Sequence, residues 1–309
     1  MTDQTLGSHD GAPAIDQLNQ PLAQPAPAAG VRLERPARVP LGWLPPERGE
    51  FFLVSNQASV GLSEAQRARV REARDAVAAR PAGIDQADLV SALPPELADH
   101  VARLAMTPPG AGMRTEGWDI AMIDLERIVA IQPSVFTDTA TQRVAGLDPG
   151  DLLSIAEMTL PINHTAPVSV EFDEFKQAYI LTSPNPNLKV VANFNGPLPN
   201  GMPGFGFGVA VAASYIQVVR FQNRYVLRDG YHRAFGLLSR GITRVPAFIR
   251  DFDTAEYLAP AGMLPQNTWL GDRPPLLRDY HDDRVAESVS LPARHRMIVI
   301  HALELFPTG

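Results

Sequence analysis

The chain has 309 residues, of which 45% are apolar, and it carries a formal net charge of −7 and no cysteine. This acidic balance disfavours general nucleic-acid binding, which needs a basic excess, and the lack of cysteine excludes disulfides, thiolate zinc sites and cysteine nucleophiles. No run approaches the roughly 20 apolar residues of a membrane helix, and Met1–Gln4 lacks the charge and apolar core of a secretory signal, so we expect a cytoplasmic protein without a membrane segment.

The first 40 residues are rich in alanine, proline, glutamine and aspartate and poor in large apolar side chains. A segment of this composition cannot bury enough surface to offset its ordering entropy. We predict that residues 1–40 are a disordered leader, in which Gln20–Pro27 is a tether or a short motif that docks a protein partner.

Residues 41–110 are expected to form a strand followed by helices. The apolar run Phe51–Val54 predicts the strand. Ser63 and Gln66 stand at capping-box spacing and begin a helix that good helix formers continue to Arg80. Shorter helices are expected at Asp85–Leu93 and Glu96–Met106. The region carries no chemical motif, so we interpret it as packing or cover.

Strand patterns dominate from Trp118 onward. Asp151 is a helix N-cap candidate, and Asn193–Gly208 is expected to be a glycine-rich loop. The elements expected here are a helix at Leu152–Met158 and strands at Ile120–Ile123, Pro167–Phe172, Ala178–Thr182 and Leu188–Ala192.

The clearest local pattern is a hairpin that runs into a helix. Two strand runs flank Gln222-Asn223, and the second run leads through Asp229-Gly230 into an amphipathic helix that ends at Gly241. The elements are Tyr215–Phe221, Arg224–Leu227, the helix Tyr231–Arg240 and a returning strand Val245–Ile249. The rest is loop-rich to about Leu291 and closes with a strand at Arg296–Leu305.

The turn Asp229-Gly230-Tyr231-His232-Arg233 is the candidate functional site. Helix N-termini expose N–H groups without intrahelical partners, and a phosphate is a natural ligand there. Gly230 would allow close approach, and Tyr231, His232 and Arg233 would contact the phosphate. Asp229 and His232 are the candidate acid, base or metal contacts. The structural alternative is an ordinary N-cap beside a solvated arginine and histidine.

The stretch from Tyr225 to Phe248 resembles the ParB/sulfiredoxin superfamily. In that superfamily a strand enters a turn of the "DG-x-HR" type, followed by a helix, a glycine and a short strand around a proline, as Tyr225–Ala234, Gly241 and Arg244–Phe248 do here. The resemblance implies a nucleotide ligand, ATP or CTP with Mg²⁺, with Gly230, His232 and Arg233 at its phosphates. The set of metal ligands stays open, with Asp229 as a candidate base or metal contact.

Three departures narrow that resemblance. Tyr231 stands where sulfiredoxins have their reactive cysteine, which excludes sulfiredoxin chemistry. No helix-turn-helix pattern follows Phe252, which argues against a ParB-type DNA clamp. Residues 161–213 look like an insertion before the hairpin that could form a pocket wall or a lid.

Other constellations carry weaker signals. Gly204–Gly208 lacks the Walker and dinucleotide patterns, and a glycine-rich loop or a strand with one bare face explains it better than a lid. Tyr280–Asp283 offers donors for a divalent ion, but a solvated acidic loop is the simpler interpretation. Asn163–Thr165 suits a surface loop, and His295 and His301 receive no role.

The sequence thus predicts an α/β protein, with a mixed α+β sheet and a ParB/sulfiredoxin-like core at 111–255. A helical N-terminal region precedes the core, and a loop-rich extension at 256–309 ends in a strand. We expect binding of a nucleotide or a small phosphorylated ligand, with phosphotransferase or nucleotide hydrolase activity. The alternative is a catalytically silent interaction or scaffold protein whose partner docks on the leader or on the insertion.

Overall fold

The computed structural model describes residues 34–54, 62–163, 168–185, 187–197, 201–255, 258, 262–293 and 296–301. All of them belong to one compact unit that begins at Glu34. The predicted docking motif Gln20–Pro27, the loop residues His164 and Thr165, and His295 lie outside the described residues.

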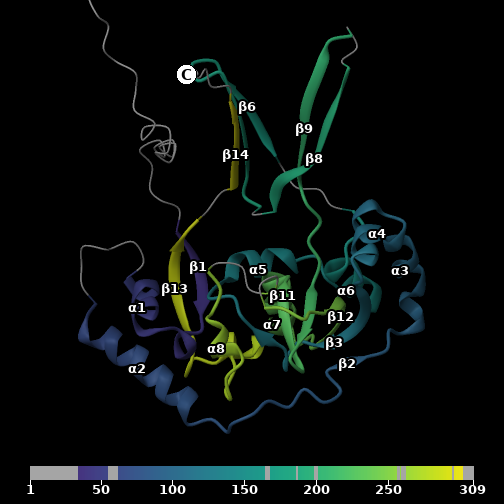
Figure 1. The fold of residues 1–309 in the computed structure, drawn as a ribbon. Coiled ribbons are helices and arrows are strands. Elements are labelled where there is room, and N and C mark those ends of the chain that lie inside the picture. The colour runs from purple at the N-terminus through teal and green to yellow at the C-terminus, as the bar shows by residue number, and fades with distance from the viewer. Residues whose placement is uncertain are drawn as a thin grey trace, which may run out of the picture. The chain divides into compact units, whose positions relative to one another are not determined.

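A six-stranded mixed sheet organises the core (Figure 1). The predicted hairpin is present, and its turn residues Gln222 and Asn223 both have positive φ, 47° and 60°, as a tight hairpin turn requires. The sheet order is β2 (Val90–Ser91), β3 (Asp119–Asp124), β12 (Arg244–Asp251), β10 (Gln217–Phe221), β11 (Arg224–Asp229) and β4 (Val129–Ala130). Because β12 pairs parallel with β10 and antiparallel with β3, the expected mixed sheet of an α/β protein is confirmed.

Three helices support the turn at the end of β11: α7 (Tyr231–Ser239), α5 (Thr137–Arg143) and α6 (Leu152–Thr159). A Cβ on Gly236 would stand 2.7 Å from the carbonyl oxygen of Ala140, so a glycine is required where α7 meets α5. As predicted, Asp151 caps α6 by accepting a hydrogen bond from the amide of Leu153.

The N-terminal boundary of the fold differs from the prediction. Residues 34–40 were expected to belong to a disordered leader, but Glu34–Val39 form β1, which lies between β13 (Glu287–Pro292) and β5 (Val135–Phe136). Ala37 and Val39 are buried on one face of this strand. The partners of β1 lie about 100 and 250 positions further along the chain, so local composition could not reveal them.

The helical region also departs from its predicted pattern. The run Phe51–Val54 is not a strand but the end of α1 (Pro46–Val54), since proline at the first position and Glu47 in the first turn favour a helix. The helix expected at Asp85–Leu93 is absent from the described structure, and β2 pairs with β3 instead. The predicted capping box is confirmed in α2 (Glu64–Ala78).

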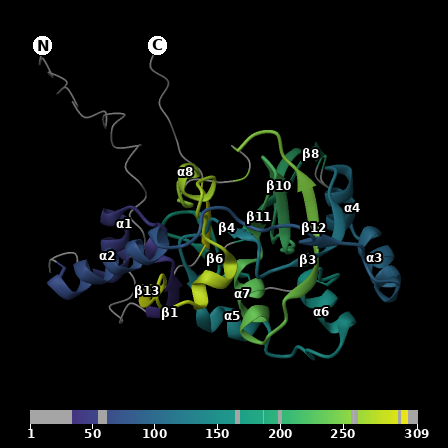
Figure 2. The same ribbon diagram turned by 90° about the horizontal axis from the view of Figure 1, so that it is seen from below.

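Short helices complete this region. The helix expected at Glu96–Met106 is η3 (Pro95–Leu97) followed by α3 (Ala98–Ala105), and α4 (Pro108–Thr115) comes next. Figure 1 and Figure 2 show α1 and α2 on one side of the central sheet and α3 and α4 on the other. None of the helices in the described ranges is both long and apolar enough to cross a membrane.

The predicted insertion forms β-structure of its own. The sheet β14-β7-β6 joins β6 (Ser169–Asp173) and β7 (Ala178–Ser183) to the C-terminal strand β14 (Arg296–His301). β8 (Leu188–Pro197) and β9 (Pro203–Val211) form a separate two-stranded sheet, which we call the apolar ribbon (Figure 1). The loop expected at Asn193–Gly208 is therefore wrong, because nine pairs of residues hold these two strands in register. The strand that was the alternative for Gly204–Gly208 is confirmed as part of β9.

The C-terminal extension returns to the N-terminal elements. It contains α8 (Gln266–Trp269), η4 (Leu277–His281) and β13, and η2 (Leu41–Trp43) follows β1. The indole of Trp43 donates a hydrogen bond to the carbonyl oxygen of Arg273 at 2.6 Å. Trp269, Leu277 and Tyr280 are fully buried, so this loop-rich segment belongs to the core.

Candidate functional site

The predicted strand, turn and helix are present around Gly230. β11 ends at Asp229, Gly230 adopts the left-handed conformation with φ of 92°, and α7 begins at Tyr231. The N-terminus of α7 has no side-chain cap, because the Asp229 carboxylate accepts only the amide of Gly230, at 2.6 Å. Asp229 is therefore not the ordinary N-cap of the structural alternative. Burial raises the pKa of its carboxyl group.

Gly230 is covered by the chain that enters β10. A Cβ at this position would stand 2.9 Å from the Cα of Ile216 and 3.2 Å from the carbonyl oxygen of Tyr215. A space too small for a methyl group cannot hold a phosphate, so a ligand cannot approach the turn from this side. Glycine is required here by packing and by its positive φ.

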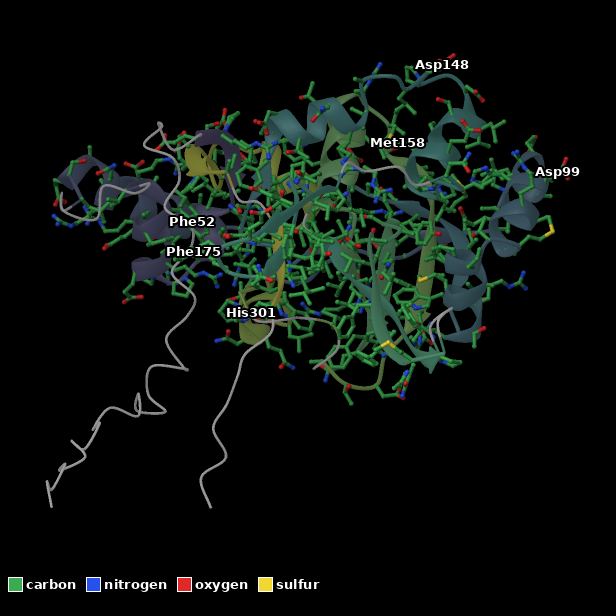
Figure 3. The ribbon with its side chains drawn as sticks, turned by 90° about the horizontal axis from the view of Figure 1, so that it is seen from above. Phe52, Asp99, Asp148, Met158, Phe175 and His301 are labelled. Carbon is green, nitrogen blue, oxygen red and sulfur yellow. The ribbon has the colours of Figure 1, made fainter. Side chains whose placement is uncertain are left out.

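The Arg233 guanidinium is turned into the protein. The residue is 6% exposed, and the guanidinium donates hydrogen bonds to the carbonyl oxygen of Met158 at 3.0 Å and to the hydroxyl of Ser214. Met158 is labelled in Figure 3. Burial lowers its pKa to about 10, so the group remains charged at neutral pH. In this arrangement Arg233 ties α7 to the end of α6 and to the segment before β10.

Tyr231 has a similar structural role. Its hydroxyl donates to the carbonyl oxygen of Leu227 and accepts the amide of Ile131 at 2.8 Å. Burial raises the pKa of this phenol, so it stays protonated. Tyr231 thereby connects β11 to the segment that follows β4.

His232 is a half-buried, neutral imidazole. Its ring stacks on Phe136 with centroids 6.0 Å apart, and its Nε2 has no hydrogen-bond partner among the described residues. Burial, followed by the charges of Arg143 and Arg35, lowers its pKa to about 4. At neutral pH this side chain offers a phosphate no positive charge.

The five turn residues are adjacent in the fold, and burial turns several of their polar groups toward protein partners. The cavity of about 600 Å³ beside η4, described below, is lined by other residues. Among the described residues no three acidic or histidine side chains are grouped to hold a metal. Binding of Mg²⁺ with a nucleotide at the turn, like the assignment of Asp229–Arg233 to its phosphates, is not tested by this arrangement. Nucleotide binding itself stays a prediction.

The segment Tyr280–Asp283 is neither a metal site nor merely a solvated loop. Tyr280 is buried, and its hydroxyl donates to the carbonyl oxygen of Gln132. Asp282 accepts Arg80 at 3.0 Å and Arg284 at 2.9 Å, and hydrogen bonds from Arg284 chiefly lower its pKa to about 2. No local sequence pattern signals this cluster, because Arg80 lies 202 positions away from Asp282.

Comparisons with known proteins find no matching family model, no matching curated protein and no matching solved structure. The resemblance to the ParB/sulfiredoxin superfamily accordingly stays a prediction that rests on the residues around Asp229–Arg233.

Proposed function

We propose that this protein is an interaction protein without catalysis of its own, and that the apolar ribbon is its docking surface. The observation that carries this proposal is the distribution of exposed apolar side chains. Of fourteen large apolar side chains exposed in the described part of the chain, five lie on the strands of the ribbon and a sixth, Met202, lies between those strands. Five more lie on or between the strands of the β14-β7-β6 sheet. Monomeric proteins seldom leave such groups clustered in water unless they bind something there.

The two faces of the apolar ribbon differ. Phe205 and Phe207 project from one face, with ring centroids 4.8 Å apart, and are 63% and 46% exposed. Phe194, paired with Gly206 in the register, lies over it, since a Cβ on Gly206 would stand 2.1 Å from the Phe194 ring. A two-stranded sheet has little stability alone in water, so further burial of these rings would stabilise the ribbon.

The ribbon is almost free of charge. Its 19 residues, ten in β8 and nine in β9, include one charged side chain, Lys189. In the whole chain 20% of residues are charged. Depletion of charge with enrichment of aromatic groups is the composition of a protein interface core, and it is strongest in homodimers.

A second copy of the chain is the partner that this composition fits best. Neither β8 nor β9 pairs with another described strand, so each presents an edge of unpaired backbone groups. Two such edges can pair around a twofold axis and bury the aromatic rings of both copies. A ribbon whose one charged side chain is a lysine also allows association of chains that each carry −7.

The test is sedimentation velocity of the full chain over a range of concentrations. We expect reversible association that is lost in the double variant Phe205→Ser/Phe207→Ser. The variant Phe51→Ser, which changes an aromatic ring that is 69% exposed in α1, should associate as the parent does. A parent that remains monomeric, or a double variant that associates equally well, would show that the ribbon is not a self-association surface.

A further inference from the structure

A cavity of about 600 Å³ lies apart from both the turn and the ribbon. Its wall combines the segment Arg80–Ile84, which follows α2, with the segment around η4. It includes Ile84, Pro274 and Leu276 beside a group of polar residues. Cavities of a few hundred cubic ångströms suit small molecules. The apolar wall and the polar group could therefore enclose one small ligand.

The charge of this cavity is positive although the chain is acidic. Four arginines line it, Arg80, Arg273, Arg278 and Arg284, against two carboxylates, Asp279 and Asp282, so the charged lining groups sum to +2. Positive side chains that gather in a concave wall concentrate anions from solution, and the net charge of −7 of the whole chain does not cancel that local field.

The two carboxylates are already occupied. Asp279 accepts the guanidinium of Arg80 at 2.9 Å and the amide of Leu276 at 2.7 Å. Asp282 accepts Arg80 and Arg284. These ion pairs, and the Trp43 ring 5.0 Å below the Arg80 guanidinium, fix the orientation of Arg80. The carboxylates therefore build the wall and leave the remaining arginines unneutralised.

Two arginines keep donors for a ligand. Arg273 uses its Nε to bind the carbonyl oxygen of Arg80, and its two terminal nitrogens have no partner among the described residues. The Arg278 guanidinium has neither a hydrogen bond nor an ion pair within the described ranges, although the side chain lines the cavity. Planar guanidinium donors match the oxygens of phosphate groups in pairs.

We propose that this cavity binds a small multivalent oxyanion, a phosphate or diphosphate group, between Arg273 and Arg278. The wall formed by Arg80, Asp279 and Asp282 holds the site in shape, and the apolar residues accommodate any organic group that the anion carries. This site is independent of the ribbon, and none of its lining residues comes from 229–233.

Isothermal titration calorimetry of the full chain with pyrophosphate, at constant ionic strength, tests the proposal. We expect saturable binding at one site and weaker binding of inorganic phosphate. The double variant Arg273→Gln/Arg278→Gln should raise the dissociation constant roughly tenfold to a hundredfold, since hydrogen bonds to charged groups are lost. The control Arg103→Gln, at an exposed position on α3, should bind as the parent does.

Two results would overturn the proposal: heats that do not exceed those of sodium chloride at equal ionic strength, or an affinity unchanged in the double variant. If the double variant loses its circular dichroism signal, the single variant Arg278→Gln at an exposed position carries the same test. Sedimentation of the arginine variants should match that of the parent, which separates this site from the proposed association.

Discussion

At the scale of single residues, burial determines which groups of the Asp229–Arg233 turn can do chemistry. Arg233 is charged but has two partners inside the protein, and Tyr231 is held neutral between two backbone groups. His232 keeps an unpartnered Nε2 within the described structure but is neutral at pH 7. In the sequence these side chains look like a charged cluster. In the fold, Arg233 and Tyr231 mainly form hydrogen bonds that hold neighbouring elements together.

His232 should make the folded state sensitive to mild acid. Its pKa is about 4 in the folded chain and near 6.5 when unfolded, so the unfolded state binds more protons between these values. Stability is therefore lost as pH falls through this window, by about 2 kcal/mol for this group between pH 7 and pH 5. Urea denaturation at both pH values should show a smaller loss in His232→Gln than in the parent.

The loss of stability must be compared between the parent and the variant, because other groups also titrate in this pH range. Burial also lowers the pKa of His281, which adds a loss of the same sign. Both proteins share that contribution, so the difference between them isolates His232. Equal losses in parent and variant would mean that His232 is protonated as easily in the folded chain as in the unfolded one.

At the scale of elements, the sequence correctly predicted the helices and turns that are determined by interactions between neighbouring residues. The hairpin, α7 and the capping box of α2 follow from turn chemistry, helical periodicity and capping. The errors at β1, β2 and β9 occur where tertiary pairing overrides local pattern. The glycines of β9 suggest a loop, but Phe194 on β8 fills the space above Gly206 and the strand is kept.

Glycine is required at position 230 both by its positive φ and by close packing, and comparison with Gly241 separates the two effects. Gly230→Ala must place a methyl group against Ile216 at a φ of 92°, whereas Gly241→Ala has a φ of 76° and nothing within 4 Å. Backbone strain alone costs about 1–2 kcal/mol, and overpacking adds about 1–3 kcal/mol. We expect urea midpoints that give about 1 kcal/mol for Gly241→Ala and about 3 kcal/mol for Gly230→Ala.

Equal effects of the two alanine substitutions would show that the chain before β10 moves aside at little cost. In that case the turn could open toward a ligand, and the phosphate site expected from the sequence would regain support. A large difference supports the closed corner described by the structure.

At the scale of the whole molecule, segments far apart in sequence build both the core and the candidate sites. The arginines of the cavity come from positions 80, 273, 278 and 284, and β14 completes a sheet with strands that begin at Ser169. No motif at fixed spacing signals such groupings. The exposed aromatics of the ribbon were visible in the sequence, but their exposure is decided by which strands remain unpaired.

β1 connects the start of the fold to strands far along the chain, and we predict that its removal lowers the free energy of unfolding. It pairs with β13 and β5, Arg35 binds Asp138 at 2.8 Å, and Arg38 donates to the carbonyl oxygen of Tyr280 at 2.7 Å. A chain that starts after Val39 should lose about 3 kcal/mol or more, from the burial of Val39 and the strand hydrogen bonds. The measurement is urea denaturation of this shortened chain and of a chain that starts at Glu34, so that the difference reports on the strand and not on the residues before it.

If both chains unfold at the same urea concentration, β1 contributes nothing to stability, and the fold effectively begins near residue 41, where the composition of the sequence first placed it.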